Sequence, residues 1–120
     1  MLKLIRAGII AFALLGPVAQ AQAPFAITNT STVNISATTS SGSVALPSGI
    51  PARSLRIFNN AGAVAFIAFG GSSITADTST SVPIAVGAVE VLSIPPEATY
   101  VAAILASGSG TIYFTVGFGV

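Results

Sequence analysis

Frequent Gly, Pro, Ser and Asn residues divide the chain, after its first 23 residues, into short apolar runs. This punctuation leaves no uninterrupted stretch for a long helix. In the last run, TIYFTVGF, Ile112 and Phe114 fall on one face and Tyr113 falls on the other, as in a β-strand. About seven such runs at short spacing predict an all-β fold, a small antiparallel β-sandwich or jelly roll.

The first 23 residues have the organisation of a secretory signal peptide. Two basic residues, Lys3 and Arg6, precede an apolar run over residues 7–15. Gly-Pro interrupts this run, and small residues in an Ala-x-Ala pattern follow it. A membrane anchor is the alternative, but a spanning helix needs about 20 apolar residues and this run is much shorter. We therefore predict a helical, signal-like leader over residues 1–23 and no stable membrane span once the leader is removed.

Residues 24–43 are rich in Ser, Thr and Asn. This composition fits either a flexible linker or a strand. Val33 and Ile35 alternate with polar neighbours, and Thr favours strands, so we expect one half-exposed strand over residues 32–37. The remaining residues, 44–120, are expected to form the β-sandwich.

Two apolar runs, SLRIF and AVAFIAF, flank residues 59–62, which are rich in turn-forming types. This pattern predicts a β-hairpin. The second run is apolar on both of its faces, and so is the later run TYVAAILA. A strand of a small antiparallel sandwich normally turns one polar face to water, so the excess of apolar faces needs an explanation.

Strands with two apolar faces predict a surface that packs against another chain, because large exposed apolar patches usually mark interfaces. The simpler alternative is that Ala on an outer face is merely small and that scattered apolar residues are normal at a protein surface. The bulk of the Phe side chains favours an interface. The candidate interface residues are Phe58, Phe66, Ile67, Phe69 and Ile104.

Charged side chains are few. Without the leader, the chain keeps Arg53 and Arg56 against three carboxylates, so two positive charges minus three negative charges leave a net charge of −1. Two basic side chains cannot neutralise a row of phosphates. We therefore expect no nucleic-acid partner.

The sequence contains no His and no Cys, which removes the most common general base and the thiolate nucleophile. A Ser-His-Asp triad is therefore impossible within one chain. The carboxylates Asp77, Glu90 and Glu97 lie apart, in turn-like and strand-like contexts. We expect a protein that is not an enzyme, with no catalytic, cofactor-binding or metal-binding residues and no cofactor.

Residues 55–119 resemble small β-rich proteins encoded in the structural modules of tailed phages and prophages. The resemblance is carried by RIFNN before VAFIAFG, by PIAVGAVEV and PPEATYVAAI, and by GTIYFTVG. It implies a virion-associated protein that decorates or cements the head as a multimer. It implies no catalytic or binding residues.

The leading hypothesis is a non-catalytic structural protein that forms a homo-oligomer, with a capsid or surface protein as a further candidate partner. We expect it to be exported, periplasmic or extracellular, if the leader is cleaved, and to be part of the virion otherwise. The alternative is an exported bacterial surface or periplasmic assembly subunit, or a carbohydrate-binding module. For such a module the candidate ligand contacts are Tyr100 and Tyr113, because a ring with a polar tip suits a partly apolar ligand.

Overall fold

The computed structural model describes residues 24–49 and 51–119, and this part of the chain is all-β, as the sequence predicts. Every pair of neighbouring strands is antiparallel, and no α-helix occurs among the described residues. The predicted leader helix, residues 1–23, lies outside the described residues. The strands are β1 (Ala26–Ala37), β2 (Gly42–Ala45), β3 (Ser54–Ala61), β4 (Ala65–Gly70), β5 (Val82–Ile84), β6 (Val89–Ser93), β7 (Tyr100–Leu105) and β8 (Gly110–Phe118).

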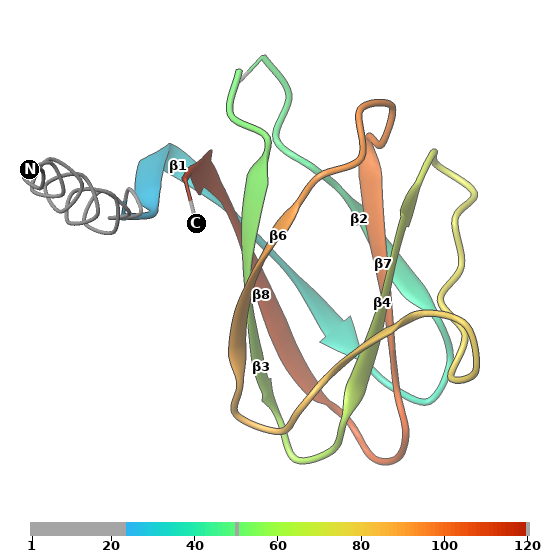
Figure 1. Ribbon diagram of the computed structural model, residues 1–120. Coiled ribbons are helices and arrows are strands. Elements are labelled where there is room, and N and C mark those ends of the chain that lie inside the picture. The colour runs from blue at the N-terminus through green and yellow to red at the C-terminus, as the bar shows by residue number, and fades with distance from the viewer. Residues whose placement is uncertain (1–23, 50, 120) are drawn as a thin grey trace, which may run out of the picture.

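The strands form two four-stranded sheets, sheet A with the order β1-β8-β3-β6 and sheet B with the order β2-β7-β4-β5. The chain changes sheet at every connection except the one from β4 to β5. This strand order is that of an eight-stranded jelly roll wound around one core. Figure 1 shows the two sheets as facing layers, with the start of β1 beside the end of β8.

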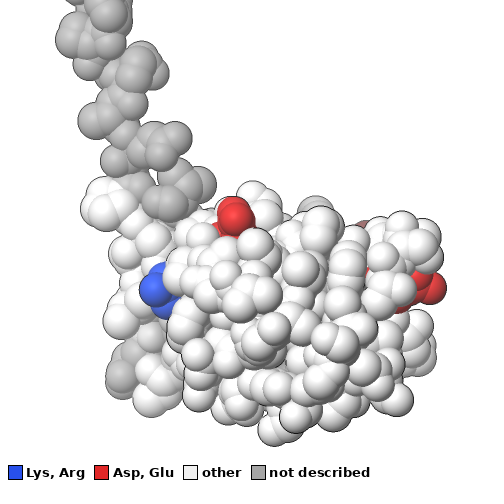
Figure 2. Space-filling model, turned by 90° about the horizontal axis from the view of Figure 1, so that it is seen from below, with Lys and Arg blue, Asp and Glu red and all other residues white. Residues whose placement is uncertain are grey.

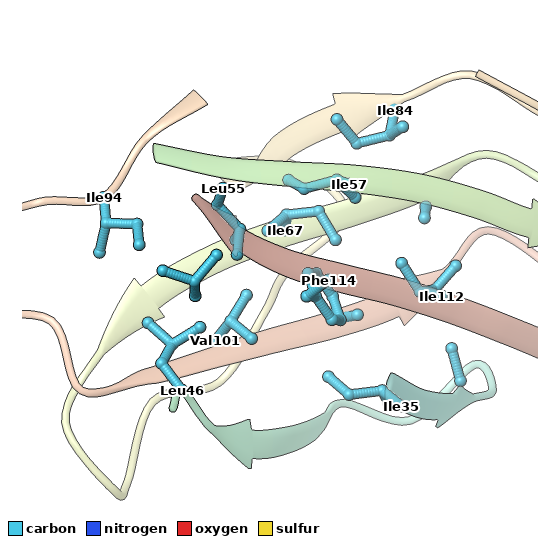
Figure 3. Packing of buried hydrophobic residues seen from close by; sticks show 14 of the residues in the cluster. Ile35, Leu46, Leu55, Ile57, Ile67, Ile84, Ile94, Val101, Ile112 and Phe114 are labelled. Atoms are coloured by element: carbon cyan, nitrogen blue, oxygen red, sulfur yellow. The ribbon is translucent and has the colours of Figure 1, made fainter. Parts of the chain in front are cut away.

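The core lies between the sheets, where each strand alternates inward and outward side chains. On β3, Leu55 and Ile57 point inward and are fully buried, whereas Arg56 between them is exposed. Phe114 on β8 is the largest fully buried side chain. Figure 3 shows apolar side chains from both sheets gathered around Phe114. Because burying such a side chain stabilises the fold by about 1.5–3 kcal/mol, this alternation holds the two sheets face to face.

The Ser/Thr-rich segment is a strand of the sandwich and not a linker. β1 pairs with β8 over most of its length, and its register shifts between Ile27 and Thr32. At this bulge the Ser31 hydroxyl donates a hydrogen bond to the Val116 carbonyl oxygen at 2.9 Å. A side chain thus replaces backbone bonds that the bulge interrupts. The sandwich therefore includes β1 and begins well before the boundary at residue 44 that the sequence predicted.

The hairpin predicted around residues 59–62 is wrong, because β3 and β4 belong to different sheets. β3 pairs with β6 and β8, and β4 pairs with β5 and β7. β3 also continues through Asn59 and Asn60 to Ala61, so the connection that leaves it, residues 62–64, crosses from sheet A to sheet B. The physical reason is that Asn59 faces the core and does not turn the chain.

Asn59 is the largest polar side chain that is fully buried in the described part of the chain. Its amide nitrogen donates to the carbonyl oxygens of Ala63 at 3.0 Å, Ile84 at 3.0 Å and Ala85 at 3.2 Å. Its oxygen accepts a hydrogen bond from the Ala61 N–H at 2.9 Å. Both ends of the amide are therefore partnered, as a buried polar group requires. The side chain joins the end of β3 to the crossing connection and to the end of β5 in the opposite sheet.

We expect Asn59→Ala to lower the free energy of unfolding by about 2–4 kcal/mol, because buried carbonyls and one N–H lose their partner. Asn59→Asp should be more destabilising at neutral pH, because a carboxylate cannot donate to three carbonyl oxygens. Urea denaturation measures both effects. Asn60→Ala is the matched control, because Asn60 is exposed, and should change stability by less than about 0.5 kcal/mol. Equal losses at the two positions would contradict this account of Asn59.

β8 approaches β3 closely at Gly110. A Cβ atom at this position would lie 2.5 Å from the Cβ and 2.6 Å from the Cα of Ala61. We expect Gly110→Ala to lower the free energy of unfolding by about 1–3 kcal/mol, because the added methyl group forces the two strands apart. Gly62→Ala is the control, because a Cβ there meets nothing within 4 Å. Denaturation of the two variants side by side gives the comparison, and a neutral Gly110→Ala would show that the strands separate without cost.

Candidate functional site

The acidic side chains do not gather in one place. Asp77 lies in the β4–β5 connection, Glu90 lies in β6 and Glu97 lies in the β6–β7 connection. Within residues 24–49 and 51–119, no group of three or more His, Cys, Asp or Glu side chains is placed to hold a metal ion. The features that remain as candidate sites are the outer faces of the two sheets, their edges and the hollows between connections.

The outer face of sheet A carries a stacked pair of aromatic rings. Phe58 on β3 and Tyr113 on β8 are directly opposite each other, with ring centroids 6.1 Å apart and 15° between the ring planes. The same row continues to Asn34 on β1 and to Val89 on β6. Tyr113 is 37% exposed and Val89 is 45% exposed. The row therefore forms an apolar surface that is open to solvent and reaches the β6 edge.

The neighbouring row of sheet A is polar toward β1. The hydroxyl oxygens of Thr32 and Thr115 are 2.8 Å apart and share a hydrogen bond. Arg56 on β3 and Val91 on β6 continue this row. Arg56 is exposed, and its guanidinium has neither a hydrogen-bond nor an ion-pair partner among the residues that the structure describes. The outer face of sheet A is thus polar near β1 and mostly apolar near β6. Arg56 is the charged side chain on its apolar part.

Three exposed valines follow one another along the chain where it passes from sheet B to sheet A. Val82 lies on β5, Val86 in the β5–β6 turn and Val89 on β6, with exposed fractions of 44%, 54% and 45%. β5 and β6 are the edge strands of their sheets. We call the segment that carries Val82, Val86 and Val89 the valine edge. Val89 lies opposite the outward Phe58 of sheet A, whereas Val82 lies opposite the inward Ile67 of sheet B. Glu90, which follows Val89, is exposed beside it.

The outer face of sheet B carries no charged residue among its strands. Its outward side chains on β4 and β7 pair across the two strands, and the bulky ones are only half-buried. Such a face would normally be covered by another layer. The outward pairs are Phe66 with Ile104, Ala68 with Ala102 and Gly70 with Tyr100.

The β4–β5 connection, residues 71–81, covers part of this face, and we call it the strap. Ala76 in the strap is buried, and its N–H donates to the hydroxyl oxygen of Ser41 at 2.8 Å, at the start of β2. Ala102 is fully buried although it lies on the outer face and outside the core cluster. Figure 1 shows the strap, in yellow, on the side of sheet B that faces away from sheet A. The chain therefore covers part of the apolar outer face of sheet B itself.

Local contacts hold the strap in shape. Ile74 lies against Gly70, where an added Cβ would come within 2.9 Å of the Ile74 Cδ1. Further along, the Asp77 carboxylate accepts hydrogen bonds from the N–H of Ser79 at 2.6 Å and from its hydroxyl at 2.5 Å. The Asp77 N–H donates to the Ser81 hydroxyl oxygen at 2.9 Å. These bonds make a compact turn in a segment that is otherwise exposed.

The residues predicted as an interface divide among three places. Phe66 and Ile104 lie together on the outer face of sheet B, and Phe58 lies on the outer face of sheet A. Ile67 is fully buried and Phe69 packs against the core, so both point between the sheets. Ile67 therefore has no surface to offer a partner. Alternation shows which residues share a face, but it does not show which face is the core.

Tyr100 and Tyr113, the predicted ligand contacts, do not share a surface. Tyr100 lies on the outer face of sheet B, and Tyr113 stacks on Phe58 on the outer face of sheet A. A single ligand site cannot use both rings. The valine edge, in contrast, was not among the predicted residues. Its signal in the sequence is the run VPIAVGAV, in which Val82, Val86 and Val89 recur around a Gly-containing turn.

Two hollows lie among the connections at one end of the sandwich. One, of about 210 Å³, is bordered by the β2–β3 and β6–β7 connections and includes Arg53, whose guanidinium donates to the Pro95 carbonyl oxygen. The other, of about 380 Å³, lies between Phe69 and the segment that contains Glu97. Each hollow has one charged side chain and mostly apolar walls, which is too little to define a ligand class.

Comparisons of the chain with protein-family models, with curated proteins and with solved structures found no match. Across the part of the chain that the structure describes, no helix has the length and apolar character needed to cross a membrane. The function must therefore be argued from the surfaces themselves and not from the fold.

The strap gives a pH-dependent prediction. Hydrogen bonds from the Ser79 hydroxyl and N–H hold the pKa of Asp77 below its ordinary value. The ionised carboxylate therefore stabilises the folded state at neutral pH, and this contribution is lost as the pH falls through the folded-state pKa. We expect the melting temperature to decline less steeply toward acid pH in Asp77→Asn than in the wild type, by a small amount because the group is exposed. Ser79→Ala should act in the same direction, and unchanged slopes in both variants would refute the effect.

Proposed function

We propose that this protein is a non-catalytic structural subunit that associates with copies of itself. The observation that carries the proposal is the apolar row on the outer face of sheet A, where Val89, which is 45% exposed, lies opposite Phe58, and Phe58 stacks on Tyr113, which is 37% exposed. Scattered apolar residues are normal on a soluble protein, but adjoining ones mark an interaction surface. The contrast with sheet B supports this inference, because there the strap lies over part of the apolar outer face, whereas Tyr113 and Val89 on the outer face of sheet A are exposed.

The distribution of reactive groups supports a structural function. The sequence has no His or Cys, and the three described carboxylates lie in three separate elements. Catalysis by a pair of carboxylates needs both groups to flank one reacting bond. The Ser31 hydroxyl donates to a backbone carbonyl oxygen of β8, and the Ser79 hydroxyl donates to Asp77 within the strap turn. These two hydroxyl groups stabilise the fold, and they lie in separate parts of the molecule and not in one cleft.

We place this subunit in a phage or prophage virion, where it would decorate the capsid. The resemblance of residues 55–119 to small virion-associated proteins supports this setting. The jelly roll is compatible with it, because that fold is common in viral capsid proteins, although it also occurs in lectins and enzymes. An exported surface or periplasmic assembly subunit is the alternative setting, and the leader-like residues 1–23 favour it.

A carbohydrate-binding module is the alternative from another functional class. One observation favours it, the exposed Tyr113 ring stacked on Phe58 with Asn34 next in the same row. Rings beside amide groups suit ligands with both apolar and hydrogen-bonding surfaces. Such a module has no need to self-associate, and the number of subunits in solution therefore separates the two functions.

Native mass spectrometry of the full-length chain, expressed in a bacterium, tests the proposal. We expect a defined oligomer, because the exposed apolar surface is buried when copies associate. An intact chain that begins at Met1 would support assembly in the cytoplasm as a virion protein. A mass that begins near Gln22 or Pro24 would support the exported subunit. A monomer at every concentration would refute self-association and leave the carbohydrate-binding module as the better candidate.

A further inference from the structure

The β6–β7 connection carries a turn with an exposed tip. The Ala98 N–H donates to the Pro95 carbonyl oxygen at 3.0 Å, and this bond closes a β-turn with Pro96 in its second position. Ile94 before the turn and Ala98 at its end are buried, so both ends are anchored in the molecule. Pro95, Pro96 and Glu97 are exposed. We call these three residues the proline turn.

Neighbouring segments hold the proline turn from both sides. Before the turn, the Ile94 N–H donates to the Arg53 carbonyl oxygen at 2.7 Å, and the Arg53 guanidinium donates to the Pro95 carbonyl oxygen. After the turn, the Thr99 N–H donates to the carbonyl oxygen of Gly70, the last residue of β4, at 3.0 Å. The proline turn is therefore fixed before any partner arrives. A group that is already ordered loses little conformational entropy when it binds.

Glu97 is an acidic side chain that a partner can reach beside rigid apolar groups. It has no hydrogen-bond or ion-pair partner for its side chain among residues 24–49 and 51–119. The other two carboxylates are placed differently, because Asp77 is bonded to Ser79 within the strap and Glu90 lies opposite the inward Ile57. Figure 2 shows how few charged groups the molecule has on the face seen there. An unpaired charge beside two exposed prolines is therefore a distinctive surface on this chain.

The outer face of sheet A carries the complementary groups. Phe58 stacks on Tyr113 there, and Arg56 precedes Phe58 by two residues on the same side of β3. The Arg56 side chain is exposed and, like that of Glu97, has no partner in the described part of the chain. Two positions along a strand correspond to about 7 Å. This face therefore presents an aromatic pair and a cation about 7 Å apart along the strand.

The proline turn matches this face in chemistry and in spacing. Proline-rich segments commonly dock on aromatic side chains, because their conformation is fixed before binding. The Cα atoms of Pro96 and Glu97 are about 3.8 Å apart, and the length of the glutamate side chain makes up the difference to Arg56. Within one copy no ion pair joins Glu97 to Arg56. The turn lies among the connections at one end of the sandwich, whereas Arg56 lies on the outer face of a sheet.

We propose that copies of this chain associate through the proline turn of one copy, which docks on the outer face of sheet A of another. Pro96 packs there against the Phe58–Tyr113 pair, and Glu97 pairs with Arg56. This inference rests on the proposed function, because it names the surfaces through which the subunit self-associates. The proline and the aromatic rings supply apolar burial, and the ion pair sets the orientation of the copies. Every copy carries both surfaces, so the same contact is repeated throughout the assembly.

Charge reversal tests the contact in the full-length chain. We expect Arg56→Glu and Glu97→Arg each to raise the dissociation constant of the assembly at least about tenfold, because each reversal places like charges together at every contact. Sedimentation velocity over a range of protein concentrations measures this change. Melting temperatures should match that of the wild type, because both side chains are exposed and unpaired. A matched melting temperature shows that a loss of association is not a loss of folding.

Mixing the two variants is the decisive measurement. In the mixture, the Glu97 that remains in one variant meets the Arg56 that remains in the other. The introduced glutamate likewise meets the introduced arginine. We therefore expect association to return when Arg56→Glu and Glu97→Arg are mixed, and the double variant to associate as the wild type does.

Glu90→Arg is the matched control for Glu97→Arg. It makes the same change of net charge at another exposed glutamate, which lies on the side of sheet A that faces away from the proposed contact. We expect this variant to associate as the wild type does. An equal loss with Glu90→Arg would show a general effect of charge and would overturn the contact.

The outcomes separate this inference from the function on which it rests. A wild-type chain that stays monomeric refutes both the proposed function and the contact. An oligomeric wild type whose association is unaffected by the reversals at Arg56 and Glu97, or is not restored on mixing, refutes the contact alone. Self-association would then remain, through another surface of the chain.

Discussion

The buried amide of Asn59 joins the two sheets at the point where the chain passes from β5 to β6. Its side chain donates to the carbonyl oxygens of Ile84 and Ala85, and its backbone exchanges hydrogen bonds with Gly87 and Ala88. One residue of β3 thus holds both ends of the turn that carries Val86. If this amide lost its partners, the core would loosen and the turn would lose its shape. The stability of the fold and the position of this turn therefore depend on the same hydrogen bonds.

The two sheets deal with their apolar outer surfaces in different ways. The strap lies over part of the outer face of sheet B, where Ala76 and Ala102 are buried outside the main core. The apolar end of sheet A has no such cover among the described residues and continues into the valine edge. A chain of this size buries only part of its surface when it folds, and its polar residues cannot cover the rest. Some apolar residues therefore remain at the surface once the core is filled. An outer face of sheet A that is partly apolar and exposed is consistent with so few charged side chains.

Local patterns predicted the class of the fold and several strands, but not the way in which they are assembled. Alternation in TIYFTVGF is sufficient to recognise β8, and the alternation of Val33 and Ile35 locates the later part of β1. Asn59 misled the prediction, because Asn next to Asn and Gly favours a turn, whereas its actual partners lie up to 26 residues away. Local sequence could not predict the position of the strap for the same reason, because its hydrogen bond to Ser41 joins residues 35 apart in the chain. Of the candidate surface, Phe58 was predicted from its bulk, and the valines were missed because exposure at a sheet edge depends on strand order.

The pairing of Ala26 with Phe118 brings the two ends of the described chain to one place, on β1 and β8. β1 and β6 are the opposite edges of sheet A. Anything joined to either end of the domain is therefore attached on the far side of the sheet from the β6 edge. Segments that precede β1 and segments that follow β8 would therefore leave the sandwich side by side, and neither would start at the β6 edge.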